Sequence, residues 1–264
     1  MRGGCLFVSH GGGPMPLLGD LSHASMVKFL RAHEYRPSAV LLISAHWQTT
    51  VPTLTSGARP QLIYDYGGFP PKSYQYTYAA SGDPALAKRA AALLQAAGIA
   101  ARLDESRGWD HGVFVPMMLM FPKADIPIVC LSLLTNADPA KHFELGRALR
   151  PLRDEGVLIL GSGSSYHNMG GFFGGVANAA EASAAFDAYL TTACAAPAAE
   201  RRKLLVDWER APCARACHPP GGEEHLLPLH VVAGAAFDDE SGTKLWTEPD
   251  FFGRVTMSSW GFSV

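Results

Sequence analysis

The sequence has almost no excess of charge and no long apolar run, and both absences exclude classes of protein. Its 264 residues give a formal net charge of −2, and the Lys and Arg residues are scattered. A nucleic-acid backbone therefore finds no basic surface to bind. No segment approaches the roughly 20 apolar residues that cross a bilayer, and the apolar run after Cys5 is shorter than a signal-peptide core. We expect a cytoplasmic protein that binds neither nucleic acid nor membrane, and its oligomeric state is left open.

Cysteine is scarce as well. The five cysteines form an odd set that is too sparse for a disulfide framework: Cys5, Cys130, Cys194, Cys213 and Cys217. Only the spacing Cys213-x-x-x-Cys217-His218 suggests a haem-attachment or zinc motif. A haem motif has two intervening residues, however, and no second cysteine pair completes a structural zinc site. Free thiols, with this pair at the end of a helix, are the favoured interpretation.

What the sequence does contain is an alternation of short aliphatic runs with helical patterns. With 48% hydrophobic and 17% charged residues, it can build a sizeable core. The pattern predicts strands over residues 6–9, 40–44, 126–133 and 157–160, and a final strand over 255–263. This alternation is typical of an α/β fold. We expect one domain over residues 1–264, with a central, largely parallel or mixed β-sheet flanked by helices.

Proline and glycine mark the expected helix boundaries. The dipeptide Asp-Pro opens two helical segments, at 83–84 and at 138–139, and a glycine closes each, at positions 98 and 156. An Ala-rich helical pair is expected over 179–212, broken near Pro197. A further helix is expected over 223–237 despite Pro228.

Histidines at strand ends are the most informative feature. His10 ends the first expected strand before three glycines, and His46 ends the second in the segment Ser44-Ala-His46-Trp47. Ligands of open α/β sheets bind at the carboxyl ends of strands, and glycines allow the backbone to approach closely. Either histidine alone would be read as a structural residue. Because their contexts match, the pair predicts half of a metal site.

Three more histidines have a similar setting. His111 precedes an apolar stretch, His167 follows the fourth expected strand, and His225 lies with Glu224 at the start of a helix, after His218-Pro219. The remaining histidines fall within amphipathic segments and are predicted to be surface or packing residues: His23, His33, His142 and His230.

Rival motifs fit the same segments less well. The glycine-rich segment 161–165 follows a strand and could cradle a phosphate, but it lacks the ending of a P-loop and the third glycine of a dinucleotide fingerprint. No segment supplies the Gly-x-Ser-x-Gly elbow of a serine hydrolase. Nucleotide binding and acyl transfer are therefore disfavoured.

Taken together, these segments resemble the class III extradiol dioxygenase superfamily, and within it the DOPA 4,5-dioxygenase-like proteins. The resemblance runs nearly end to end. It rests on His10-Gly, on Ser44-Ala-His46-Trp47 and on the aromatic segment Tyr64-Asp-Tyr-Gly-Gly-Phe-Pro70. It extends through 110–116, 121–127, 161–168 and the segment from His218-Pro to Glu224-His225-Leu-Leu-Pro. Each segment is common alone, whereas the ordered set is specific.

The resemblance implies a set of roles for these residues. His10, His46 and His225 would bind one divalent metal, with Glu224 as the alternative third ligand. His225 stands where better-known members carry a glutamate, which gives a trio of imidazoles that suits Zn(II) as bound, whereas turnover requires Fe(II). His167 would be the acid–base residue and His111 its neighbour that steers substrate or dioxygen.

The implied partners are a small aromatic substrate, a catechol such as DOPA, and O2. Trp47, Tyr64, Tyr66 and Phe69 are candidates for contact with the aromatic ring. Two other hypotheses keep the fold but change the function: a zinc-dependent hydrolase at the same site, and a non-enzymatic metal-binding scaffold.

Overall fold

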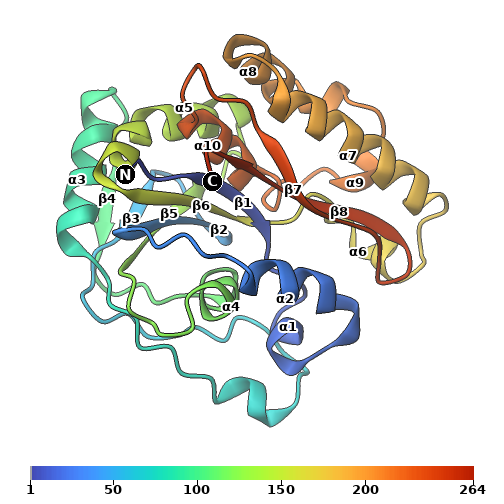
Figure 1. Cartoon of the computed structure of the whole chain (residues 1–264), viewed down its shortest axis with the longest axis horizontal. Coiled ribbons are helices and arrows are strands. Elements are labelled where there is room, and N and C mark those ends of the chain that lie inside the picture. The colour runs from blue at the N-terminus through green and yellow to red at the C-terminus, as the bar shows by residue number, and fades with distance from the viewer. Residues whose placement is uncertain (1) are drawn as a thin grey trace.

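A single mixed sheet forms the centre of the molecule (Figure 1), in a computed structural model that describes residues 2–264. The strand order is β4-β3-β5-β2-β6-β1-β8-β7. The strands are β1 (Cys5–Ser9), β2 (Ala39–Thr49), β3 (Thr53–Thr55), β4 (Arg102–Asp104), β5 (Ile128–Leu134), β6 (Val157–Gly163), β7 (Thr243–Phe251) and β8 (Val255–Phe262). The α/β prediction is confirmed.

The four middle strands of the sheet are parallel, and antiparallel pairings join them to the outer strands on both sides. β5, β2, β6 and β1 pair in parallel, whereas β8 pairs antiparallel with both β1 and β7, and β3 meets β5 antiparallel. The parallel strands are buried along nearly their whole length, as strands covered on both faces must be. The carboxyl ends of β1, β2 and β6 therefore meet at one edge of the sheet.

Helices cover both faces of the sheet (Figure 1). α3 (Pro84–Ala96), α5 (Pro139–Leu149), α7 (Ala179–Ala195), α8 (Ala198–Val206) and α10 (Leu227–Ala235) lie on one side. α1 (Met15–Leu18), α2 (Ala24–Arg31) and α4 (His111–Met120) lie on the other. The short helices α6 (Met169–Phe172) and α9 (Ala214–Cys217) lie beside the β7–β8 hairpin in this view.

The predicted boundaries hold where a capping residue fixes them. Asp83 and Asp138 accept backbone N–H bonds at the starts of α3 and α5, and Gly156 takes a left-handed conformation before β6. The helix expected over 223–237 begins later, at Leu227, because Pro228 occupies its first turn. Strands β3, β4 and β7 were not predicted. β7 is largely exposed and contains Pro249, so it has little of a strand's hydrophobic pattern.

The cysteines are free, as predicted. Cys213 is exposed just before α9 and Cys217 is buried at its end. Among residues 2–264, neither belongs to a cluster that could bind a metal. No helix in this part of the chain is both long and apolar enough to span a membrane.

Candidate metal centre

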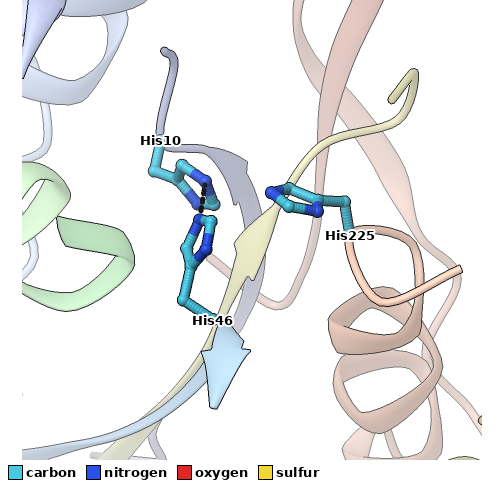
Figure 2. A group of neighbouring side chains, drawn as sticks. All are labelled: His10, His46 and His225. Carbon is cyan, nitrogen blue, oxygen red and sulfur yellow. Dashed lines mark hydrogen bonds between the residues drawn. The ribbon is translucent and has the colours of Figure 1, made fainter. Parts of the chain in front are cut away.

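Three histidines from distant parts of the chain face one another at the carboxyl edge of the sheet (Figure 2). His10 follows β1, His46 lies near the end of β2, and His225 precedes α10. One ring nitrogen from each lies within 4.8 Å of the other two. The Nε2 atoms of His10 and His46 are 3.0 Å apart. The sequence placed these three residues at element ends, and the fold brings them together.

His46 reaches this edge through an irregularity in β2. The pairing of β2 with β5 shifts register between Ile43 and Gln48, and its pairing with β6 ends at Ser44. The Oγ of Ser44 accepts the backbone N–H of His46 and donates to the carboxylate of Asp110. A β-bulge of this kind redirects a side chain next to a site.

Hydrogen bonds fix the ring orientation of His10. The hydroxyl of Ser162, on β6, donates to the carbonyl of Gly112, so its single hydrogen is used. Its oxygen must then accept from Nδ1 of His10, 3.0 Å away. The Nδ1–H tautomer leaves the Nε2 lone pair free to face the centre, which is how a metal-binding imidazole is held.

His225 is oriented in the same manner by its neighbour. Its Nδ1 lies 2.8 Å from Oε1 of Glu224, so Nδ1–H donates to the carboxylate and Nε2 faces His10 and His46. Although burial alone would raise it, bonds from His167 and His225 hold the pKa of Glu224 well below its usual range. Among the described residues, Glu224 forms no ligand group with His10 and His46. Its place is behind the third imidazole.

All three imidazoles are neutral at ordinary pH. Burial lowers the pKa of His10 far below its usual value and that of His225 to about 3. Burial and the neighbouring His111 also lower the pKa of His46. Neutral imidazole with a free lone pair is the form that binds a divalent metal. The donor set therefore fits a mononuclear metal.

Small residues in β6 let the loop that carries His225 approach the sheet. A Cβ added to Gly163 would lie 2.1 Å from the carbonyl oxygen of His225, and one added to Gly161 would lie 2.8 Å from that of Pro228. The carbonyl of His225 also accepts the N–H of Ser164 at 2.9 Å. Both glycines of segment 161–165 lie inside β6 and allow this close packing, so the segment resembles a phosphate-binding loop only in composition.

His111 lies beside the trio, at the first position of α4. Its ring centroid is 3.9 Å from that of His46. Oδ1 of Asp65 accepts from both the backbone N–H and Nδ1 of His111, at 2.9 and 2.8 Å. Oδ2 of the same carboxylate is 3.9 Å from Nδ1 of His46. Asp65 therefore fixes the ring of His111 by hydrogen bonds and lies close to the ring of His46.

His167 stacks on the other side of the trio. It lies in the loop after β6, with its ring 3.4 Å from that of His225 and nearly parallel to it. Its Nδ1 is 3.4 Å from Oε1 of Glu224. Since Nδ1 faces a carboxylate, Nε2 is the nitrogen available to the pocket.

A cavity of about 280 Å³ opens above these histidines. Its floor contains His10, His46, His111, His167 and His225. Its walls are mainly aromatic and methionine side chains: Met15, Tyr66, Phe69, Met169, Phe172, Phe173, Phe251, Phe252 and Met257. A concave apolar wall above convergent polar groups is the usual form of a small-molecule site.

Two of the four predicted ring-contact residues line this cavity and two do not. Tyr66 and Phe69 form part of the wall. Trp47 follows His46 in β2, so it points to the opposite face, where Arg107 lies over its ring. Tyr64 packs among aromatic rings, and its hydroxyl donates to the carbonyl of Tyr76. The structure therefore does not bring Trp47 and Tyr64 to the cavity, and their contact with a substrate ring stays a prediction.

Several contributing residues were missed in the sequence. Asp65 lies within the quoted aromatic segment, and Ser162 within the glycine-rich one, but nothing local marks either as a partner of histidine. His23 is buried, accepts the N–H of Gly12 at 3.0 Å and so supports the loop that lines the pocket. His218 is buried away from the cavity, with Nε2 at 3.0 Å from the carbonyl of Ser165.

A mixed sheet covered by helices, with three histidines at its carboxyl edge, is the architecture of a metal-dependent α/β enzyme. Comparisons with known proteins identify its family. Residues 17–256 match the family model described as the catalytic LigB subunit of aromatic ring-opening dioxygenase. The dioxygenase tasH of Hapsidospora irregularis is 42% identical, over 97% of this chain and 85% of the relative. The 4,5-DOPA dioxygenase extradiol of Beta vulgaris is also 42% identical, over 87% of this chain and 85% of its own.

A solved structure agrees with these matches. An uncharacterised protein of Escherichia coli K12 superposes with a TM-score of 0.78 at 31% identity, over 98% of this chain and 99% of its own. The chain belongs to the LigB family of aromatic ring-opening dioxygenases. It is an extradiol ring-cleaving dioxygenase, a non-haem metal-dependent enzyme that uses an aromatic substrate and O2. The resemblance seen in the sequence is confirmed.

Proposed function

We propose that the enzyme opens the ring of a catechol, DOPA or a related dihydroxyphenyl compound, at one divalent metal bound by His10, His46 and His225. The observation that carries this proposal is the convergence of three neutral imidazoles, with ring nitrogens within 4.8 Å, on the floor of an apolar cavity. Relatives named 4,5-DOPA dioxygenase extradiol, from Beta vulgaris and Portulaca grandiflora, support DOPA as the first compound to test.

The donor set accepts either of two metals. Three imidazoles suit Zn(II), which has no accessible redox state, whereas ring cleavage needs a redox-active ion, for which Fe(II) is the candidate. When bound, the metal supplies the positions at which the catechol oxygens and O2 are activated. A zinc hydrolase at the same site would use this donor set too, but membership of a ring-opening family supports oxygen chemistry.

His167 is proposed as the residue that moves the catechol proton. Its ring lines the cavity, and Nδ1 faces Glu224, so Nε2 can accept the hydroxyl proton of a catechol that enters above the trio. The carboxylate stabilises the imidazolium that forms. The same Nε2–H can return the proton later in the reaction.

His111 is proposed to orient the substrate or O2 from the opposite side. Its Nδ1–H is held by Asp65, which leaves Nε2 free at the cavity floor. Tyr66 and Phe69 would pack against the aromatic ring and exclude water from it. The protein's contribution is thus orientation and proton handling.

The proposal is tested by loading the protein with Fe(II) under anaerobic conditions, then adding DOPA or catechol in air. We expect oxygen uptake together with a yellow semialdehyde product. A zinc-loaded sample is the control, and it should bind catechols without consuming oxygen. Absence of turnover across a panel of catechols would overturn the proposal.

A further inference from the structure

The cavity wall is apolar from the metal centre to its mouth. Phe172 and Phe173, on and just after α6, meet Phe251 and Phe252 of the β7–β8 hairpin, with ring centroids 5.7 to 6.4 Å apart across the two segments. Phe252 takes a left-handed backbone conformation, with φ of 57°, at the tip of this hairpin. Two segments far apart in sequence thus build one continuous aromatic wall.

That wall extends to the surface. Met169 and Phe173 line the cavity and are nevertheless 53% and 73% exposed. Exposed large apolar side chains that border a pocket mark a surface that receives an apolar group. Under the proposed function the metal at the floor would bind the catechol oxygens, so a substituent on the far side of the ring would point toward this mouth.

No charged side chain lines the cavity within residues 2–264. The hydroxyls of Tyr66 and Ser164 are already engaged, since Tyr66 donates to the carbonyl of Ser73 and Ser164 to that of Tyr166. The nearest carboxylates, Asp65 and Glu224, lie behind the histidines and would repel an anion. A charged substituent would therefore lose water without gaining a partner.

A cation that lies close to this wall is Arg254, which is exposed on the β7–β8 turn. Its guanidinium packs over Gly174, about 3.0 Å from where a Cβ on that residue would lie, and it does not line the cavity. An ion pair at such an exposed position contributes little to binding because water screens it.

From this wall we propose that the enzyme selects catechols whose ring substituent is uncharged and apolar, such as an alkyl or aryl group, over amino-acid and carboxylate catechols. The inference rests on the proposed catechol chemistry and narrows its substrate class. An apolar substituent would lie against Phe172 and Phe252, with its far end between Met169 and Phe173.

The test compares 4-methylcatechol and 4-phenylcatechol with DOPA, dopamine and 3,4-dihydroxyphenylacetate. Dissociation constants are measured anaerobically on zinc-loaded protein, and kcat/KM by oxygen uptake on iron-loaded protein. We expect both measures to favour the uncharged catechols by roughly tenfold or more. Equal or reversed preference would overturn the inference and leave the ring-cleaving function standing. Failure of every catechol to bind or react would overturn the function itself.

Variants at the mouth make the test specific. Phe173→Arg should shift the ratio of kcat/KM values toward 3,4-dihydroxyphenylacetate, whereas Phe173→Gln should weaken 4-phenylcatechol without improving the anion. Leu21→Arg is the matched control, because Leu21 is 88% exposed and lies outside the cavity, so its ratio should equal that of the wild type. A selective loss of DOPA turnover in Arg254→Ala would contradict the inference, since it would show a carboxylate bound at the rim.

Discussion

Two groups of buried histidines in this molecule differ in how their ring nitrogens are used. At the sheet edge, His10 and His225 each have one nitrogen bonded to a side chain and the other free to face a common centre. The second group lies in helices α5 and α10. There, His142 accepts the N–H of Leu134 with Nε2 and donates from Nδ1 to the carbonyl of Asp138. His230 contacts backbone carbonyls with both of its nitrogens.

The difference shows that burial of a histidine does not identify a metal ligand. Both groups are almost inaccessible to solvent, and burial lowers the pKa in both, to about 3 for His225 and about 4 for His142 and His230. In the helices both ring nitrogens face main-chain atoms, whereas each sheet-edge ring turns one nitrogen toward the other imidazoles. A free nitrogen aimed at other free nitrogens is the property that separates function from packing.

The distinction between the two groups of histidines would fail if removal of a sheet-edge histidine left metal binding intact. We expect His10→Ala and His46→Ala to lose metal affinity by more than the roughly 10–100-fold typical of changes to outer-shell partners. Metal content after equilibrium dialysis measures this directly. His142→Gln serves as the control and should keep full occupancy. Equal occupancy in His10→Ala and wild type would remove the ligand assignment.

Loss of His167 should separate turnover from metal binding. Because His167 is proposed to handle a proton, His167→Ala should retain metal while kcat falls by about 10²–10⁴-fold. Oxygen uptake and metal analysis on the same sample check both parts. His33→Ala, outside the cavity, should match wild type in both measurements. Unchanged kcat in His167→Ala would contradict the proposed role.

The Asp65 carboxylate tests whether hydrogen bonds that orient the sheet-edge histidines matter, since Asp65 would affect the metal only through those histidines. Although burial would raise it, the hydrogen bond from His111 keeps the pKa of Asp65 below its usual value. Asp65→Asn removes the charge, and we expect metal affinity or turnover to fall by about 10–100-fold. Asp154→Asn is the control, since Asp154 also makes a 2.8 Å contact through its carboxylate, to Arg2, and does not line the cavity. Its metal affinity should stay at the wild-type value.

The smallest expected effect is on how the free energy of unfolding depends on pH, through His142 in α5. The pKa of His142 lies at about 4 in the native state and about 6.5 when unfolded, so only the unfolded chain takes up a proton between these values. Stability should therefore fall as pH decreases from about 6.5 to 4, by at most about 1.4 kcal/mol per pH unit for this group. Urea unfolding of metal-free protein should show a shallower decrease in His142→Gln. Identical slopes would show that His142 does not contribute.

Sequence patterns predicted the parts of this molecule that local chemistry determines. Caps fixed the starts of α3 and α5, and histidines at strand ends gave the sheet-edge group, because parallel strands must end together. Asp65 and Ser162 escaped prediction because their partners, His111 and His10, are distant in sequence. Trp47 adjoins His46 in the sequence but does not line the cavity, because alternation along a strand places the two side chains on opposite faces.

The contact between β6 and the loop before α10 has a consequence for how this site can change. Position 225 is set by main-chain atoms, through its carbonyl on Ser164 and the missing side chain at Gly163. The anchor does not depend on which side chain residue 225 carries. If residue 225 is the third metal ligand, as proposed, a substitution there can exchange imidazole for carboxylate while the main-chain position of the donor stays constant. One amino-acid change would then alter the metal preference of the site.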